Sequence, residues 1–269
     1  MNKKLIAIDL DGTTLRSDNT ISNYTKETFK KLQDDGHSIV ITTGRPYRMS
    51  IDIYKELGLA SPMINFNGAM VTKPSDKNWD FKDEKQVDKD IVRDLLKNQN
   101  SFKLDFLAAE YRRKFFINNF NAVSPQLFGV KEFKPYNKLE ETKLTANPNA
   151  LLLQTTSPNK HTIAKNINEY YKDQVSVAAW GGPNQILEIV PKNVSKASGL
   201  QHLLDVMNID KNDLLAFGDE QNDVEMLKFA PESYAMKNAN PILLEHAKNQ
   251  TKWTNDEDGV AKTLEDLLL

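Results

Sequence analysis

The chain has 269 residues, of which 39% are hydrophobic and 27% charged, a composition typical of folded globular proteins and not of disordered ones. Its 35 basic and 37 acidic residues give a formal net charge of -2 without a basic tract, so we expect no nucleic-acid partner. The absence of cysteine excludes disulfides, zinc-thiolate sites and a cysteine nucleophile, and it fits a reducing cytoplasm.

Membrane insertion and secretion are not indicated. No apolar run approaches the roughly 18 to 20 residues that a membrane-spanning helix needs. Near the N-terminus, Asp9 and Asp11 interrupt the short apolar run before a signal-peptide core is complete. The sequence therefore predicts a soluble, cytoplasmic protein without a membrane partner, and nothing in it specifies an oligomeric state.

The first part of the chain alternates between short buried strands and amphipathic helices. Such alternation predicts a parallel sheet with right-handed crossovers and helices on both faces. The first helix is expected to be capped near Ser22 or Asn23 and to end at Gly36. The elements predicted in chain order are a strand at 4–8, a helix at 21–35, a strand at 38–42, a helix at 46–57 and a strand at 63–66.

The same alternation returns near the C-terminus. Apolar residues at 200, 203, 204 and 207 have helical spacing and precede a buried strand. The elements predicted there are this helix, a strand at 214–217, helices at about 221–229, 240–248 and 259–269, and short strands at 233–236 and 252–254.

The middle of the chain differs in composition from the two ends. Polar stretches rich in lysine and asparagine separate strand-like runs at 114–117, 151–156 and 175–180. We therefore predict an α/β protein in which a Rossmann-like parallel-sheet core, residues 1–82 and 189–269, carries an inserted α/β cap domain at residues 83–188.

Asp9 and Asp11 stand where the first strand ends and the chain turns at Gly12. The carboxyl end of a parallel strand faces the crevice in which α/β sheets bind ligands. Two carboxylates this close repel one another unless a cation is present, and Mg²⁺ prefers oxygen ligands. An acidic pair before glycine is also ordinary turn chemistry, so the motif needs support from the rest of the chain.

Thr42, Thr43 and Gly44 follow the second predicted strand. Hydroxyl and amide donors beside a glycine suit phosphate oxygens. A polar turn before a helix that starts with proline explains the same residues without a ligand.

Lys196 lies at the start of a predicted amphipathic helix, where a cation opposes the helix dipole but can pair with a bound anion. A solvated surface lysine is the alternative, and Lys192 is equally basic and close by.

The strand at 214–217 also ends in glycine and acidic residues. Asp219, Glu220, Asn222 and Asp223 crowd this turn. If this strand neighbours the first one, the acidic side chains converge, and so dense a negative site favours a bound metal ion over a solvated loop.

Together, DLDGT, TGR, SK and GDEQND resemble the motifs of the haloacid dehalogenase superfamily, and more narrowly its Cof-type phosphatase branch with a large α/β cap (type IIB). Segments 64–69 and 178–191 are similar to those that enter and leave that cap. The resemblance covers nearly the whole chain. It implies a Mg²⁺-dependent phosphatase that hydrolyses a small phosphorylated metabolite, most simply a sugar phosphate, through an aspartyl-phosphate.

The resemblance also implies a role for each motif residue. Asp9 is the expected nucleophile and magnesium ligand, and Asp11 is the expected acid/base, whose backbone carbonyl also binds magnesium. The remaining metal residues are expected to be Asp219 and Asp223, the latter through water. The expected phosphate-binding residues are Leu10, through its amide, together with Thr43, Gly44, Lys196 and Asn222. Lys196 is also expected to pair with Asp9.

The sequence departs from the family pattern at Ala197, where glycine is usual, and at the variable pair Glu220 and Gln221. Neither change removes a side chain that the chemistry requires. Specificity is expected to come from the cap, where Arg112, Arg113 and Trp180 are candidates.

Three other functions remain open. A phosphomutase or phosphotransferase uses the same phosphoenzyme. A receiver domain also combines acids, magnesium, threonine and lysine, but it needs only about 120 residues and an adjacent acid pair. A silent phosphate-binding regulator is expected to lack Asp9 or Asp11, and both are present.

Overall fold

The computed structural model describes residues 3–182 and 184–269. It divides into two compact units. The first comprises Met1–Arg45, Ser50–Asp83 and Ser195–Leu269, and the second comprises Pro46–Met49 and Glu84–Val194. Each unit has its own sheet and its own hydrophobic core.

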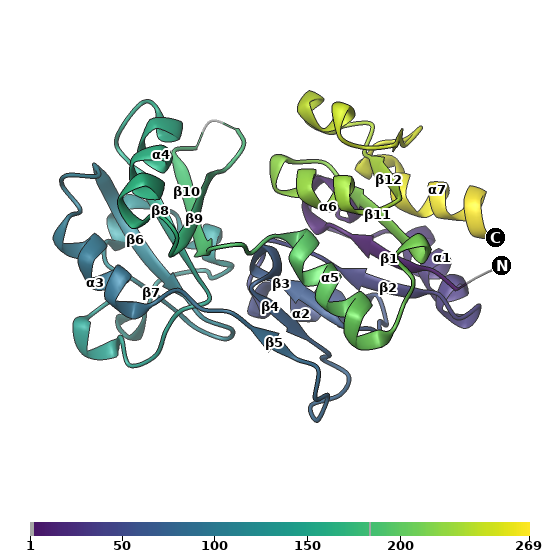
Figure 1. Ribbon diagram of the computed structural model, residues 1–269, viewed down its shortest axis with the longest axis horizontal. Helices are drawn as coiled ribbons and strands as arrows, with labels where there is room; N and C mark the ends of the chain where they lie inside the picture. Colours follow the sequence, from purple (N-terminus) through teal and green to yellow (C-terminus); the bar gives the residue numbers. More distant parts are fainter. Residues whose placement is uncertain (1–2, 183) are drawn as a thin grey trace. The chain divides into compact units, whose positions relative to one another are not determined.

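The first unit is built on a five-stranded parallel sheet in the order β13-β12-β11-β1-β2 (Figure 1). All four residues of β1 pair with both β11 and β2, and all four side chains are buried. This explains the uninterrupted apolar run of a strand covered on both faces. The strands are β1 (Leu5–Ile8), β2 (Ser38–Ile41), β11 (Leu214–Gly218), β12 (Glu232–Ala235) and β13 (Asn249–Gln250).

The helices of this unit begin where the sequence supplies caps. The hydroxyl of Ser22 accepts from the backbone N–H of Thr25 at 3.0 Å. In the same way, the hydroxyl of Ser195 caps the helix that begins at Lys196 by accepting from the N–H of Ser198 at 3.2 Å. The helices are α1 (Asn23–Asp34), α2 (Tyr47–Glu56), whose first turn belongs to the second unit, α5 (Lys196–Met207), α6 (Val224–Phe229) and α7 (Gly259–Leu268).

A second, three-stranded sheet follows β2 in the order β3-β4-β5. Its strands are β3 (Met63–Asn65), β4 (Met70–Thr72) and β5 (Asp83–Glu84). A parallel bridge between Thr42 and Ile64 links the end of β2 to β3. The chain around residues 42–45 therefore lies beside the turn that joins β3 to β4.

Two predicted elements near the C-terminus are wrong. Residues 240–248 do not form an α-helix, because only a short 3-10 helix, Pro241–Glu245, is present. Leu243 is its one buried residue, which gives too little apolar contact to extend the helix. Residues 252–254 do not form a strand, because the sheet is joined earlier by polar Asn249–Gln250, which no apolar pattern marks.

The second unit contains an antiparallel sheet in the order β7-β6-β8-β10-β9. Two helices pack on one face, and on the other face an aromatic cluster gathers around Phe128. The elements are α3 (Lys89–Lys97), β6 (Leu104–Glu110), β7 (Phe115–Ile117), β8 (Ala150–Thr155), α4 (Lys160–Tyr171), β9 (Val175–Ala179) and β10 (Ile186–Pro191). The predicted fold class, a parallel-sheet core with additional α/β structure, is confirmed.

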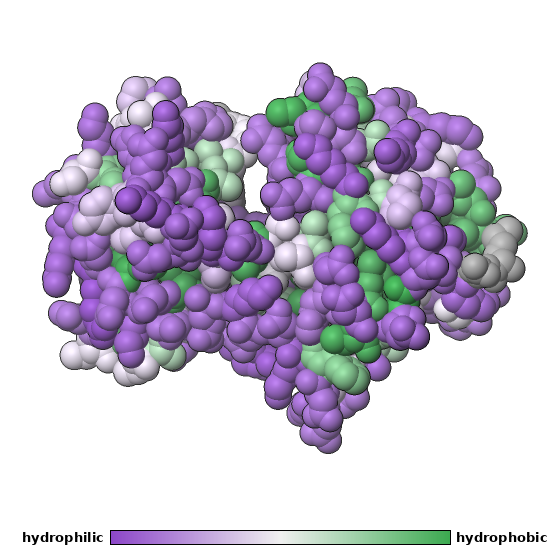
Figure 2. Space-filling model, viewed as in Figure 1, coloured by the Kyte–Doolittle hydropathy of each residue, from purple (hydrophilic) through white to green (hydrophobic). Residues whose placement is uncertain are grey.

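Hydrophilic residues predominate on the face seen in Figure 2, with smaller hydrophobic areas over both units. Within the described part of the chain, no helix combines the length and apolar character needed to cross a bilayer.

Candidate active site

The candidate site lies in the first unit, where β1 and β11 end side by side. Ile8 pairs with Phe217 in parallel register, so Asp9 and Asp219 leave the same edge of the sheet. The N–H of Asp9 still donates to the carbonyl of Phe217 at 3.2 Å. In parallel α/β sheets this edge is the usual place for ligands, because the strand ends meet there.

Lys196 occupies the centre of the site. Its Nζ donates to Oδ1 of Asp9 and to Oδ1 of Asp223, each at 2.6 Å. The Lys196 side chain is fully buried, and the Asp9 and Asp223 side chains are 7% and 0% exposed. The structure therefore rules out a solvated role for this lysine.

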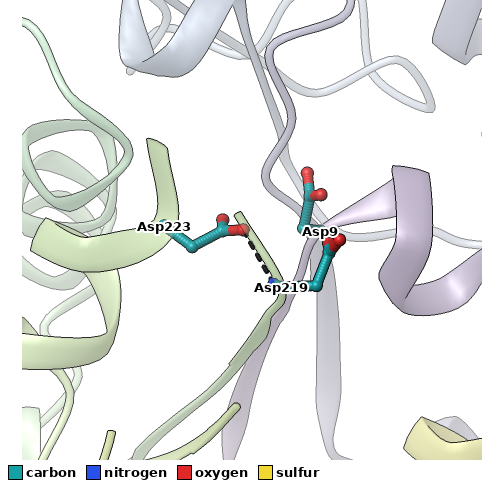
Figure 3. A group of neighbouring side chains, drawn as sticks. All are labelled: Asp9, Asp219 and Asp223. Carbon is teal, nitrogen blue, oxygen red and sulfur yellow. Dashed lines mark hydrogen bonds between the residues drawn. The ribbon is translucent and has the colours of Figure 1, made fainter. Parts of the chain in front are cut away.

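Asp219 completes the acidic group. One carboxylate oxygen from each of Asp9, Asp219 and Asp223 lies within 4.8 Å of the others, and Figure 3 shows the three side chains converging. The hydroxyl of Thr13 donates to Oδ1 of Asp219 at 2.8 Å. Gly12 makes this approach possible, because it has a φ of +69° and a Cβ there would lie 2.2 Å from Oδ2 of Asp219.

The carboxylate of Asp223 already has several partners. Its Oδ2 accepts from the backbone N–H of Asp219 at 3.0 Å, drawn as a dashed line in Figure 3, and from that of Glu220 at 3.1 Å. Its other oxygen accepts from Lys196. Asp223 is therefore suited to hold the turn and to contact a metal through water, whereas Asp9 and Asp219 are better placed for direct ligation.

Burial and crowding shift the ionisation of this group. Burial raises the pKa of Asp9 well above its usual value, Lys196 lowers it, and Asp223 and Asp219 raise it again. Burial, with Asp223, raises the pKa of Asp219 to about 7. Burial lowers the pKa of Lys196, but Asp223 and Asp9 outweigh this effect and raise it. Three carboxylates around one lysine are an oxygen-rich set that fits a hard divalent cation.

Asp11 is not part of the group formed by the other three acids, and it contacts Arg45 instead. Its carboxylate accepts from Nε of Arg45 at 2.8 Å and also from Nη2 of the same guanidinium, while Nη2 donates to Oδ1 of Asn19 at 2.9 Å. The Asp11 side chain is 58% exposed. Arg45 therefore holds a carboxylate that remains partly open to solvent.

The other predicted phosphate-binding residues differ in their burial and in their contacts. Thr43 is buried and its Oγ1 accepts from the N–H of Arg45 at 3.1 Å. Asn222 is exposed, and its Nδ2 donates to Oδ1 of Asn67 at 3.0 Å. Gly44 also lies against the Asn67 side chain. Leu10 is buried in the turn that follows Asp9.

The specificity candidates lie in the second unit. The guanidinium carbons of Arg112 and Arg113 lie 4.5 and 5.2 Å from the ring centroid of Tyr47. Trp180 is separate from this pair, and its Nε1 donates to Oε2 of Glu188 at 3.2 Å.

Reasoning from the sequence assigned no role to three residues that the structure places at the site, namely Arg45, Asn67 and Thr13. Arg45 directly follows Gly44 in the TGR motif, so its position was a usable signal. Asn67 precedes Gly68, and an Asn-Gly pair marks a tight turn. Nothing in the local pattern indicates that Thr13 contacts Asp219, which is 206 positions away.

Comparison with known proteins identifies relatives that are named as phosphatases. The 5-amino-6-(5-phospho-D-ribitylamino)uracil phosphatase YitU of Bacillus subtilis is 34% identical, with 97% of this chain and 96% of that protein covered. YcsE of the same organism, a phosphatase with the same named substrate, is 27% identical, with 97% and 94% covered. These phosphatase names support the prediction of a phosphoric monoester hydrolase.

Solved structures agree. A haloacid dehalogenase-like hydrolase from Bacteroides thetaiotaomicron superimposes with a TM-score of 0.85 at 25% identity, covering 99% of this chain and 100% of that one. TM0651 from Thermotoga maritima gives a TM-score of 0.82 at 26% identity, covering 100% and 98%. The family model described as haloacid dehalogenase-like hydrolase matches residues 6–264. The chain therefore belongs to the haloacid dehalogenase-like hydrolase family, as the resemblance of its motifs predicted.

Proposed function

We propose that the chain is a Mg²⁺-dependent phosphatase that hydrolyses a small phosphorylated metabolite through an aspartyl-phosphate on Asp9. The observation that carries this proposal is the contact of Lys196 with both Asp9 and Asp223 beside Asp219. A lysine buried at the end of β1 can neutralise a phosphoryl group that is bound against Asp9. Phosphoryl transfer requires mainly alignment and charge neutralisation, which this arrangement supplies.

The two steps divide between Asp9 and Asp11. In the first, a carboxylate oxygen of Asp9 attacks phosphorus, the bond to the leaving oxygen breaks, and Asp11 donates its proton to that oxygen. In the second, the Asp11 carboxylate takes a proton from water, the water oxygen attacks phosphorus, and the bond to Asp9 breaks. Phosphate leaves, Asp9 is again a carboxylate and Asp11 is again protonated.

The remaining residues bind and orient the phosphoryl group. Lys196 holds one oxygen of Asp9 and so fixes the direction of attack. The Leu10 amide, Thr43, Gly44 and Asn222 are proposed to donate to phosphate oxygens. Arg45 donates to both oxygens of the Asp11 carboxylate in this structure, so one of these two contacts has to open for Asp11 to carry the proton that the first step needs.

Magnesium would be held by Asp9 and Asp219 directly, with the Asp11 carbonyl, and by Asp223 through water. The donor set fits, because the three carboxylates carry more negative charge than Lys196 balances. When bound, the ion supplies positive charge that offsets repulsion between these acids and a phosphate.

For the substrate, we propose a phosphate ester of a sugar or sugar alcohol. Two relatives with nearly full coverage are both named for 5-amino-6-(5-phospho-D-ribitylamino)uracil, in which the phosphate is on a ribityl chain. This compound is therefore the first to test here.

The inserted segment, predicted at residues 83–188, is proposed to choose among substrates without taking part in the chemistry. Every residue with a proposed chemical role lies in the first unit. If this division holds, Arg112→Ala, Arg113→Ala and Trp180→Ala change the order of preference among metabolites but preserve hydrolysis of a small aryl phosphate. An unchanged order in all three variants would argue against it.

Turnover of 4-nitrophenyl phosphate and a metabolite panel, with and without Mg²⁺, tests the proposed reaction. Mass spectrometry of acid-quenched protein should locate one phosphoryl group on Asp9. The acid quench should be one that preserves the phosphoryl group of known acyl phosphates. Release of phosphate without an adduct on Asp9 under these conditions would contradict the covalent mechanism.

Transfer of the phosphoryl group to a sugar is the second candidate, because the same phosphoenzyme serves both reactions. Adding acceptor sugars and analysing the products separates them. Hydrolysis predicts that inorganic phosphate remains the main product, whereas a mutase or transferase predicts a new phosphorylated sugar.

A further inference from the structure

The turn between β3 and β4 has a backbone that L residues rarely adopt. Phe66, Asn67 and Gly68 have consecutive φ values of 51°, 53° and 107°. Residues in such conformations persist only where their surroundings hold them, and they concentrate at functional sites. The mechanism proposed above assigns no role to this turn.

The turn is fixed between two parts of the candidate active site. On one side, the N–H of Asn67 donates to the carbonyl of Thr43 at 3.1 Å, and that of Phe66 donates to Arg45 at 3.3 Å. On the other side, a Cβ on Gly68 would lie 2.0 Å from the carbonyl oxygen of Ser195. Ser195 caps α5, which begins at Lys196. The turn therefore contacts both the loop at 43–45 and the end of the helix that carries the lysine.

The Asn67 side chain links two further parts of the site. Its Oδ1 accepts from Nδ2 of Asn222 at 3.0 Å. A Cβ on Gly44 would lie 3.2 Å from both Oδ1 and Nδ2 of Asn67, so the carboxamide lies directly against that glycine. The contact with Oδ1 restricts the orientation of the exposed Asn222 amide.

We infer that Asn67 is a positioning residue of the phosphate site, holding the Asn222 amide and the backbone at Gly44 in the geometry that binds a phosphoryl group. This inference rests on the proposed function. The left-handed turn is needed because it directs the carboxamide at both partners. Asn67 acts through these partners and not on the reacting atoms. Its removal therefore weakens phosphate binding more than it slows the chemical step.

The variant Asn67→Gly distinguishes the contribution of the side chain from that of the backbone conformation. Glycine adopts a positive φ readily, so the turn is retained while the carboxamide is lost. We expect the KM for 4-nitrophenyl phosphate and the inhibition constant of inorganic phosphate to rise by about 3- to 10-fold, the factor for one lost hydrogen bond. The kcat and the Tm should change little.

A double variant tests whether Asn67 acts through Asn222. Residues that act as a unit give non-additive effects. Asn67→Gly combined with Asn222→Ala should weaken phosphate binding by less than the two single effects combined, because only the part that acts through the backbone at Gly44 then remains. Full additivity would overturn the inference, because Asn67 would then act independently of its partner.

Asn208→Gly is the matched control. Asn208 also has a left-handed backbone, with a φ of 52°, but it lies at the C-terminal end of α5 and has no proposed role. If both glycine variants shift KM alike, or if Asn67→Gly shifts neither KM nor phosphate inhibition in an active enzyme, the inference is wrong.

A calorimetric titration of inorganic phosphate in the presence of Mg²⁺ tests the proposed function and the positioning role of Asn67 separately. A wild type that binds phosphate without hydrolysing any ester would contradict the proposed function, and weaker binding by Asn67→Gly would still support the positioning role. A wild type that neither hydrolyses nor binds phosphate would overturn both.

Discussion

The two units bury charge in different ways. In the second, buried Glu110 accepts from Arg48 at 2.7 and 2.9 Å, and Nζ of Lys160 donates to the carbonyls of Gly182 and Asn184 at 2.8 and 2.9 Å. Glu110 and Lys160 thus each have at least two hydrogen bonds from groups that compensate their charge. In the first unit, three acids converge around the single lysine 196.

This difference distinguishes buried charges that serve only the fold from buried charges that serve a function. A buried ion that is paired or solvated by carbonyls can serve the fold alone, because its desolvation is compensated locally. An excess of buried carboxylates destabilises the fold unless something else binds there. We therefore expect substitutions in the two units to have opposite effects on activity and stability.

The largest expected effect is that of Asp9→Asn. An amide cannot form the covalent intermediate, so turnover of 4-nitrophenyl phosphate should be lost almost completely. The Tm should not fall, because Lys196 keeps Asp223 and one excess negative charge disappears. Asp52→Asn, at a side chain that is 89% exposed, is the control and should change neither property. Substantial turnover, or a clearly lower Tm, would contradict this account of the first unit.

Removal of metal should have a comparable effect on activity. With excess chelator, repulsion between the acids and an anionic substrate is no longer offset, and hydrolysis should stop until Mg²⁺ is restored. Mg²⁺ should also raise the Tm of the wild type, since a ligand that binds only the folded state stabilises it. The increase should be much smaller in Asp219→Asn. Full activity in chelator, unaffected by added Mg²⁺, would exclude the proposed metal site.

In the second unit, Glu110→Met should mainly lower stability. Arg48, whose side chain is 14% exposed, would lose its carboxylate, and breaking a fully buried pair typically destabilises a protein by about 3 to 5 kcal/mol, which is the upper bound here. Replacing both partners by methionine should recover most of this loss, because it leaves no uncompensated charge. Denaturant unfolding, followed by a signal from the second unit, measures both variants. Equal destabilisation by the single and double variants would show that the pair is not merely structural.

The sequence predicted the parts of the fold that depend on continuous apolar patterning. The run at 4–8 identified β1 because a strand paired on both sides is apolar along its whole length. The same reasoning failed at Asn249–Gln250, an exposed edge strand with no apolar residue. It also failed at 240–248, a predicted helix in which Ile242 and Leu244 are in fact exposed, by 45% and 46%.

The candidate site shows a similar limit. Asp9, Lys196, Asp219 and Asp223 could be singled out, since Asp9 follows a strand, Lys196 begins a helix, and Asp219 and Asp223 lie in the acidic turn after a strand. The family resemblance implied that Lys196 pairs with Asp9, which the structure confirms, but the contact between Arg45 and Asp11 was not predicted. Asp11 lies only two residues from Asp9 yet contacts Arg45, which is 34 positions away. Contacts between distant segments depend on tertiary structure, which local spacing does not encode.

The smallest expected effect concerns His37 in the first unit, a buried titratable group outside the acidic cluster. Its Nδ1 accepts from the backbone N–H of Lys4 at 3.0 Å, which requires that this nitrogen carry no proton. Burial, followed by the charge of Lys3, lowers the pKa of His37 from its usual value of 6.5. The unfolded chain therefore binds this proton more readily than the folded one. The stability that His37 contributes is present above about pH 6.5 and is lost as the pH falls through the folded pKa.

His37→Asn should retain an acceptor near the Nδ1 position without a group that titrates. The free energy of unfolding, measured between pH 5 and pH 8, should therefore fall less steeply toward acid in this variant than in the wild type. His161→Asn, at an exposed position on α4, is the control and should retain the wild-type slope. Identical slopes in all three proteins would mean that the acid sensitivity arises from other groups, with the clustered carboxylates of the first unit as the next to test. Because Lys4 directly precedes β1, a steeper acid loss in the wild type would also show that the strand carrying Asp9 is held in part by this neutral histidine.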